Sequence, residues 1–256
     1  MSQIHRFPIV FALTLAPALT VGCATAPPAV PAYTPQFTYS YPPGEAPASD
    51  VTIAIVRPID ADASAVPTPG TTLAAPSKKR AQVEADFKSG IVAQLQELFH
   101  KKGFRQTGPF DDLNSMTFPD KKGSDLTLTT QVGLRVAIPE EHGKIDQGFG
   151  DQLVGTSVAF VESQGPCSAT GYISFVMLEP LSGEKIWIKK VDMPPTQVDC
   201  SGKGPLGDFN VIDNGYAQLL ERAFQLTMKK AWDYLAPEEV TLLKKQSQEL
   251  RAKKVY

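Results

Sequence analysis

The chain has 256 residues, of which 42% are hydrophobic and 20% charged, and its net charge at pH 7 is −2. This length supports one sizeable core or two small ones. Residues 1–22 hold one arginine and no acidic residue, so the remainder has 24 basic against 27 acidic residues. That balance leaves no basic stripe of the kind that nucleic-acid-binding proteins carry. We therefore expect no nucleic-acid partner.

The first residues have the pattern of an export signal. Arg6, with His5 beside it, precedes the apolar run 7–19, which contains two prolines and is shorter than the roughly 20 residues of a membrane-spanning helix. Gly22 then stands directly before Cys23, as at a lipoprotein cleavage site. We predict that residues 1–22 are a cleaved leader and that Cys23 carries a diacylglyceryl group plus an acyl chain such as palmitate, because stable anchoring needs two or more chains. The alternative is an ordinary secretory signal with an incidental cysteine.

Residues 23–35 are predicted to form the lipidated cysteine and a proline-rich tether. Prolines remove amide donors and fix φ, which disfavours a helix or a central strand. At about 3.1 Å per residue, such a tether would reach roughly 35 Å from the membrane.

The folded domain is predicted to begin at residue 36. Residues 37–41 alternate aromatic and hydroxyl side chains, which predicts a short strand, and the apolar segment 51–56 predicts a strand covered on both faces. Residues 60–78 predict an exposed loop. Apolar residues at three- and four-residue spacing predict a helix over 79–102, and Phe104 is expected to begin a returning strand.

The clearest strand pattern lies at residues 126–138, where apolar side chains occupy the even positions and polar ones most of the odd positions. One buried and one solvated face follow from this alternation, which indicates a mainly antiparallel sheet. Residues 172–178 and 185–191 predict a hairpin, because the turn between them contains Pro180 and Gly183. Residues 157–163 are a further candidate strand.

Two helices are predicted to end the chain. Residues 211–235 carry a continuous apolar stripe, and residues 237–256 begin with proline and two acidic residues and form a thinner amphipathic helix. The expected architecture is α+β: one domain over residues 36–236, with long helices on one face of a twisted, mainly antiparallel sheet, and a C-terminal helical extension.

Cysteine usage agrees with export. With Cys23 assigned to the lipid, Cys167 and Cys200 remain, each in a Gly/Pro-containing polar segment. An exported chain is expected to oxidise such a pair. The bridge would contribute roughly 3–4 kcal/mol in the chain-entropy model.

Catalytic and metal-binding patterns are weak. His100 stands at a predicted helix end and His142 in a predicted loop, and no close cluster of histidine and cysteine suggests zinc. Residues 202–207 match G-x-G-x-x-G, but no buried strand precedes them and a proline interrupts them, so no dinucleotide is expected. We predict a non-enzymatic protein without metal or cofactor. Trp187 and Lys189 share a strand face and are candidates for a carbohydrate platform, with packing of the sheet face as the alternative.

The chain resembles the neuraminyllactose-binding haemagglutinin family of bacterial lipoproteins through the order and spacing of five segments: Ile55–Pro58, Phe87–Gly103, Gly133–Arg135, Leu178–Glu184 and the helix from Asp213 to Lys230. This resemblance implies an outer-membrane or surface lipoprotein and a sialylated glycan as candidate ligand. The family's basic stretch after the long strand corresponds here to residues 140–147, where Lys144 is the only lysine or arginine, beside three acidic residues. Sialic acid carboxylates pair with Arg or Lys, so this difference argues against a strong adhesin.

Together these observations predict a lipid-anchored envelope protein with a binding domain, periplasmic or surface-exposed. Its partner would be a sialylated glycan or another envelope protein. The alternative is a structural or assembly lipoprotein of the outer membrane that acts through protein contacts, with the C-terminal helix as a candidate surface.

Overall fold

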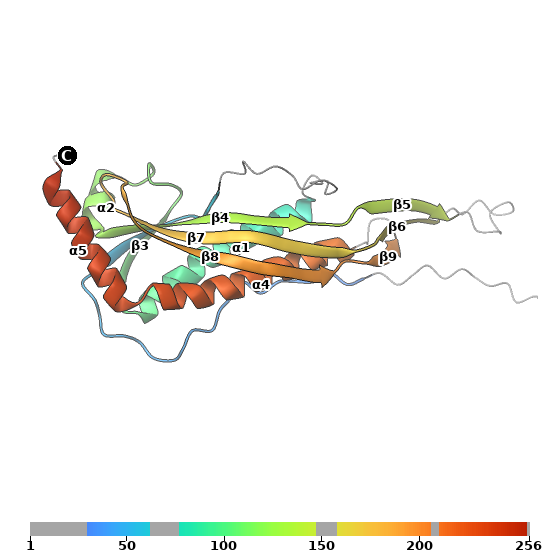
Figure 1. The fold of residues 1–256 in the computed structure, drawn as a ribbon, viewed down its shortest axis with the longest axis horizontal. Coiled ribbons are helices and arrows are strands. Elements are labelled where there is room, and N and C mark those ends of the chain that lie inside the picture. The colour runs from blue at the N-terminus through green and yellow to red at the C-terminus, as the bar shows by residue number, and fades with distance from the viewer. Residues whose placement is uncertain (1–29, 62–76, 147–157, 206–209, 255–256) are drawn as a thin grey trace, which may run out of the picture.

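The chain forms a long, twisted sheet with two long helices along one face, as the computed structural model shows (Figure 1). The model describes residues 30–61, 77–146, 158–205 and 210–254. Within these ranges the elements are β1 (Thr52–Val56), β2 (Ile59–Asp60), α1 (Lys78–Lys101), β3 (Arg105–Phe110), α2 (Phe118–Gly123), β4 (Leu126–Ala137), β5 (Glu141–Asp146), β6 (Val158–Ser163), β7 (Pro166–Leu178), β8 (Lys185–Asp199), β9 (Gly202–Pro205), α4 (Val211–Tyr234) and α5 (Pro237–Lys253). The α+β class predicted from the sequence is confirmed.

The main sheet has the strand order β3-β1-β4-β7-β8, with β2 beside β4. The long strands β4, β7 and β8 are antiparallel, whereas the short strands β1, β2 and β3 join in parallel. The predicted hairpin is therefore present, and its strands are longer than the sequence pattern indicated. Pro194 and Pro195 fit within β8 because β8 lies at the edge of the sheet, where a missing amide donor breaks no ladder.

The alternation in β4 is only partly expressed as one buried and one solvated face. Thr127 and Thr129, on the face predicted to be solvated, are buried. The register pairs Thr127 with Ala54 of β1, and Met116, from the segment before α2, packs against Ala54. This segment covers one end of the outer face, and the second half of β4 follows the predicted pattern, with Arg135 exposed.

The core lies between the sheet and the layer of α1 and α4. Both helices follow the predicted ranges closely, and Ser77 caps α1 by accepting a hydrogen bond from the Arg80 backbone N–H at 3.1 Å. The largest fully buried side chains come from the helices and the sheet together: Phe87, Phe99, Phe175, Phe224, Ile53, Ile55, Ile91, Leu95, Leu98, Leu126, Leu128 and Ile173.

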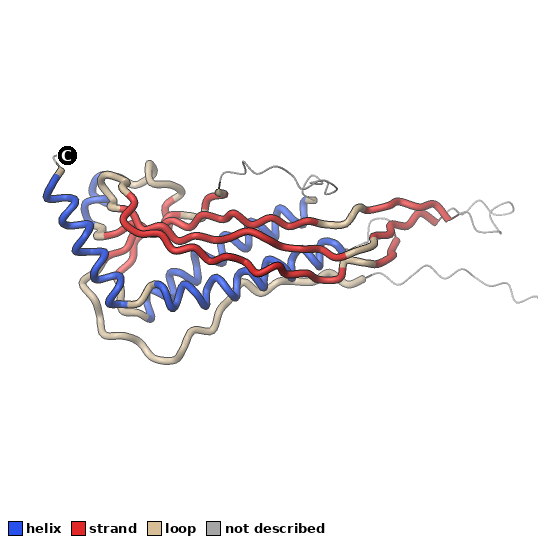
Figure 2. Tube along the Cα trace, in the orientation of Figure 1, coloured by secondary structure: helices blue, strands red, loops and turns tan. Residues whose placement is uncertain are grey.

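Residues 30–50, which we call the strap, run as an extended segment without strand pairing along α1 and α4 (Figure 2). The predicted strand at 37–41 is therefore wrong. Its alternating aromatic residues pack on the helices instead: the Phe37 ring lies 5.6 Å from that of Phe87 and 5.5 Å from that of Phe224. Side-chain amides replace the strand partners, because Gln94 accepts from the Tyr39 backbone N–H at 3.1 Å and Gln225 donates to the Thr38 carbonyl at 2.8 Å.

The strap is fastened at both ends of the helix layer. Near its start, Asn210 donates to the Val30 carbonyl at 2.9 Å; near its end, the Ser49 N–H donates to the Gly103 carbonyl at 2.7 Å. Residues 30–35, which the sequence assigned to the tether, thus lie against α4.

A second, three-stranded sheet of order β5-β6-β9 extends from one end of the molecule, opposite the end that carries α5 (Figure 1). The candidate strand at 157–163 is present as β6. The segment around residues 140–147, interpreted from sequence as a loop, contains β5, and the glycine-rich residues 202–205 form β9. The sequences of β5 and β9 contain few apolar side chains, so they show no alternating pattern that would predict a strand.

Helix α5 crosses the other end of the main sheet and is held there by a buried ion pair. Arg251 Nε lies 2.7 Å from Glu179 Oε1, and the Glu179 side chain has no exposed surface. Glu179 also accepts hydrogen bonds from the backbone N–H groups of Leu181 and Ser182 in the β7–β8 turn. These donors outweigh the opposing effect of burial and lower the pKa of Glu179 to about 2.

This depressed pKa predicts a pH dependence of stability. The carboxylate of Glu179 titrates near its usual value of 4.5 when unfolded and near 2 when folded. Its contribution is complete above pH 4.5 and is lost as the pH falls from 4.5 towards 2. Denaturant unfolding across this range should show the free-energy gap between wild type and Glu179→Gln shrinking with falling pH. A gap independent of pH would contradict the assignment.

Candidate functional site

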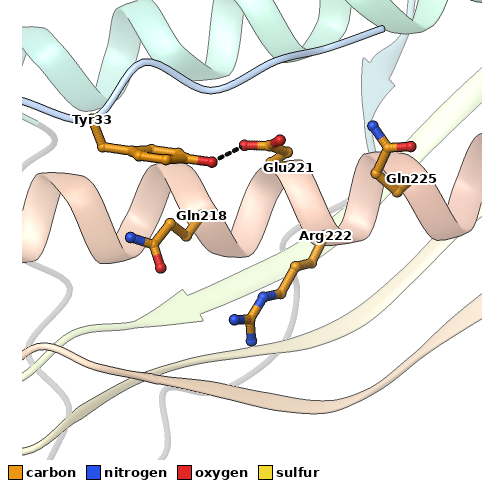
Figure 3. Close-up of a pocket in the computed structure, with 5 residues that line it drawn as sticks. All are labelled: Tyr33, Gln218, Glu221, Arg222 and Gln225. Carbon is orange, nitrogen blue, oxygen red and sulfur yellow. Dashed lines mark hydrogen bonds between the residues drawn. The ribbon is translucent and has the colours of Figure 1, made fainter. Parts of the chain in front are cut away.

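An open groove of about 510 Å³ lies on α4 beside the first residues of the strap. It is lined by an aromatic side chain of the strap and four polar side chains of the helix: Tyr33, Gln218, Glu221, Arg222 and Gln225 (Figure 3). The helix residues recur at three- and four-residue spacing, which places them on one side of α4.

Tyr33 is held over α4 by hydrogen bonds at both of its ends. Its backbone N–H donates to Asn214 Oδ1 at 2.7 Å, and its hydroxyl donates to the carboxylate of Glu221. Asn214 in turn donates to the Pro31 carbonyl at 2.8 Å. The hydrogen bond to Glu221 raises the pKa of Tyr33, so the phenol remains neutral at physiological pH. Tyr33 as a whole residue is 40% exposed and so can contact a ligand.

The polar side chains beside Tyr33 have hydrogen-bonding groups available for a ligand. Arg222 is exposed, and its one hydrogen bond within the described chain is a long one of 3.4 Å from Nη1 to the Gln197 carbonyl. Gln218 makes no hydrogen bond within the described part of the chain. A guanidinium, a free amide and an aromatic ring can together bind a small polar molecule that carries a carboxylate.

Trp187 and Lys189, proposed from sequence as a carbohydrate platform, lie on β8 where it faces α4 and α5. Trp187 Nε1 donates to Glu239 Oε1 at 2.8 Å, and the ring is half-buried. Lys189 Nζ lies 6.0 Å from the centre of the Trp187 ring and 5.9 Å from that of Tyr234. The packing alternative therefore accounts for Trp187, while Lys189 stays exposed.

Lys144 does not join them. It belongs to β5 in the small sheet, whereas Trp187 of β8 is hydrogen-bonded to α5. The small sheet and α5 lie at opposite ends of the molecule (Figure 1). The placement of the Lys144 side chain lies outside what the structure describes. The three residues nominated from sequence therefore do not form one site.

The predicted lipid attachment site, Cys23, lies outside the described residues. Within the described ranges, no helix is long and apolar enough to cross a membrane, and no group of three or more His, Cys, Asp or Glu side chains is arranged to hold a metal ion.

Cys167 and Cys200 form the predicted disulfide, with their Cα atoms 5.5 Å apart. Their setting differs from the polar loops expected from sequence, because Cys167 lies within β7 and both side chains are fully buried. The bridge rests on α4 at Gly215, where an added Cβ would lie 2.1 Å from Cys200 Sγ. A glycine inside a helix therefore allows the sheet to approach the helix here.

Sequence reasoning missed the groove because Tyr33 fell within the predicted tether. A signal was nevertheless present in the helix. Asn210, Asn214, Glu221 and Gln225 form a polar stripe at helical spacing, and all four bind the strap. Such a stripe beside an apolar one is typical of a helix that carries an extended segment.

Comparison with known proteins shows similarity at the level of the fold. No family model and no curated protein matches the chain. A solved structure from Helicobacter pylori, described as a neuraminyllactose-binding hemagglutinin homolog, matches with a TM-score of 0.60 and 14% identity over 85% of this chain and 100% of that chain. Two further structures match less well. A Xanthomonas campestris protein of family DUF330 has a TM-score of 0.39 and 12% identity over 86% of this chain and 99% of that chain. PelC from Paraburkholderia phytofirmans has a TM-score of 0.21 and 12% identity over 72% of this chain and 96% of that chain. The resemblance suggested by the sequence thus extends to the fold of the Helicobacter pylori protein.

Proposed function

We propose that this chain is a lipoprotein of the bacterial outer membrane, attached through Cys23, and that its domain is a non-enzymatic binding module. The leader pattern and the cysteine that follows it support the anchor. The observation that carries the proposal is the strap. The chain is bound to α4 from Val30 onward, seven residues after Cys23, so that the anchor and the domain are joined by a short connection.

Replacement of Cys23 tests the anchor. Cells grown with radiolabelled palmitate should incorporate label into the wild-type protein, and Cys23→Ala should lose both the label and the membrane association. Cys167→Ala is the matched control and should keep the label, because its thiol belongs to the disulfide. Absence of label in wild type, or label retained in Cys23→Ala, would contradict the proposal.

For the ligand, we propose that the groove on α4 binds a sialylated glycan. Arg222 provides the cation that a sialic acid carboxylate pairs with, Tyr33 provides a ring face, and Gln218 provides a free amide. The name given to the structurally similar Helicobacter pylori protein points to the same class of ligand.

Titration with sialyllactose and with lactose separates this ligand from neutral sugars. We expect binding to sialyllactose that weakens about tenfold or more in Arg222→Ala, because a charge-assisted hydrogen bond contributes about 1.5–3 kcal/mol. Lys189→Ala, an exposed cation outside the groove, should bind as wild type does. No binding to any glycan would eliminate the adhesin function and leave the anchor proposal intact.

A second candidate is an assembly role through α5. The exposed side of this helix carries Leu242, with 51% of its surface exposed, beside Glu238 and Lys245. Deleting residues 237–256 would remove Arg251 and leave the buried Glu179 carboxylate without its cation, so a single substitution is the better test. Leu242→Asp should reduce complexes recovered by cross-linking intact envelopes, and Lys229→Asp on α4 serves as control. Unchanged complexes in Leu242→Asp would argue against this route.

A further inference from the structure

The two ends of the molecule differ, and the strap determines which end lies near Cys23. Val30, the first described residue, is bound by Asn210, the residue directly before α4. The start of α4 adjoins the small sheet, because a Cβ added to Gly202 of β9 would lie 2.7 Å from the side chain of Val211. The chain therefore enters the domain at the end that carries β5, β6 and β9 (Figure 1).

The strap then crosses the whole helix layer to the opposite end. There Lys244 of α5 forms an ion pair with Asp50 at 2.9 Å. Helix α4, which the strap follows, has 24 residues and is therefore about 36 Å long.

We propose that the end formed by the small sheet stands against the lipid bilayer and that the α5 end points away from it. This proposal rests on the lipid anchor at Cys23. The seven residue steps from Cys23 to Val30 span at most about 25 Å when fully extended, which is less than the length of α4. An inverted molecule would place Val30 more than the length of α4 from the bilayer, beyond the reach of this connection.

Energy transfer to the bilayer tests the orientation. Lipidated full-length protein would be reconstituted into vesicles of phosphatidylethanolamine and phosphatidylglycerol that contain rhodamine-labelled lipid. A donor dye would be attached to Glu141→Cys at the small-sheet end or to Lys245→Cys on α5. Both positions are exposed, and the native Cys167 and Cys200 are bonded to each other. We expect several-fold higher transfer efficiency from position 141 than from position 245.

The possible outcomes separate this proposal from the anchor itself. Equal transfer from both positions on vesicle-bound protein would mean that the molecule lies flat and would overturn the orientation while leaving the anchor intact. Failure of the wild-type protein to associate with vesicles would overturn both. A Gly/Ser insertion after Thr25 that doubles the connection is the matched control. It leaves the strap unchanged and should lower the transfer from position 141.

Discussion

Replacing Arg251 by methionine should lower the free energy of unfolding by about 3–5 kcal/mol, because it leaves a buried carboxylate without its cation. Glu179 has no exposed surface, and Arg251 Nε lies 2.7 Å from its Oε1. Arg251 also donates from Nη2 to the Ser124 carbonyl at 2.6 Å, so the change removes a link between α5 and the segment after α2. Urea or guanidinium unfolding would measure the loss.

The matched control is Lys254, the residue that directly follows α5. Lys254 pairs with Glu184 at 2.5 Å, but both side chains are at least 40% exposed. Lys254→Met should therefore change stability by less than about 1 kcal/mol. The double variant Arg251→Met with Glu179→Met should recover much of the loss, since it removes the unpaired charge. Equal losses in Arg251→Met and Lys254→Met would show that the burial of Glu179 does not determine the stability of this end of the molecule.

Gly215→Ala should destabilise the protein in a manner that depends on the disulfide. The added Cβ would lie 2.1 Å from Cys200 Sγ and 3.1 Å from Cys167 Sγ, so α4 or the bridge must move. Overpacking of this kind costs about 1–3 kcal/mol. The background Cys167→Ala with Cys200→Ala removes both sulfur atoms and leaves Val198 Cγ2, 3.2 Å from the added Cβ, as the remaining close contact. The same change should therefore cost at least about 1 kcal/mol less there, because the severe overlap is gone and alanine has the higher helix propensity.

This difference in cost is measured by a double-mutant cycle in denaturant unfolding. Gly123→Ala at the end of α2 is the control, because a Cβ there meets nothing within 4 Å. The same destabilisation by Gly215→Ala with and without the cysteines would mean that the bridge does not rest on this glycine.

The parts of the fold that follow from local pattern were predicted from the sequence. The alternation in β4, the apolar stripe of α4 and the turn with Pro180 and Gly183 each reflect a structure whose periodicity is set within one segment. The disulfide also followed from the cysteine count and the export expected from the sequence. Each of these features required no knowledge of which segments meet in space.

The features that were missed depend on contacts between distant segments. Phe37 and Tyr39 alternate with polar residues as a strand would, but Gln94 and Gln225, which hold this part of the strap, lie on two helices far along the chain. Gly215 likewise contacts a disulfide whose two cysteines lie on segments distant in sequence from α4. The groove beside Tyr33 is missed for the same reason, because it exists only where the strap meets α4.

Mass spectrometry of the amino-terminal peptide of protein purified from native membranes would decide whether Cys23 is the lipid anchor. We expect a mature chain that begins at Cys23 and carries a diacylglyceryl group and an additional acyl chain, followed by the unmodified residues that lead into the strap. A chain that retains residues 1–22, or one that begins with an unmodified Cys23, would contradict it.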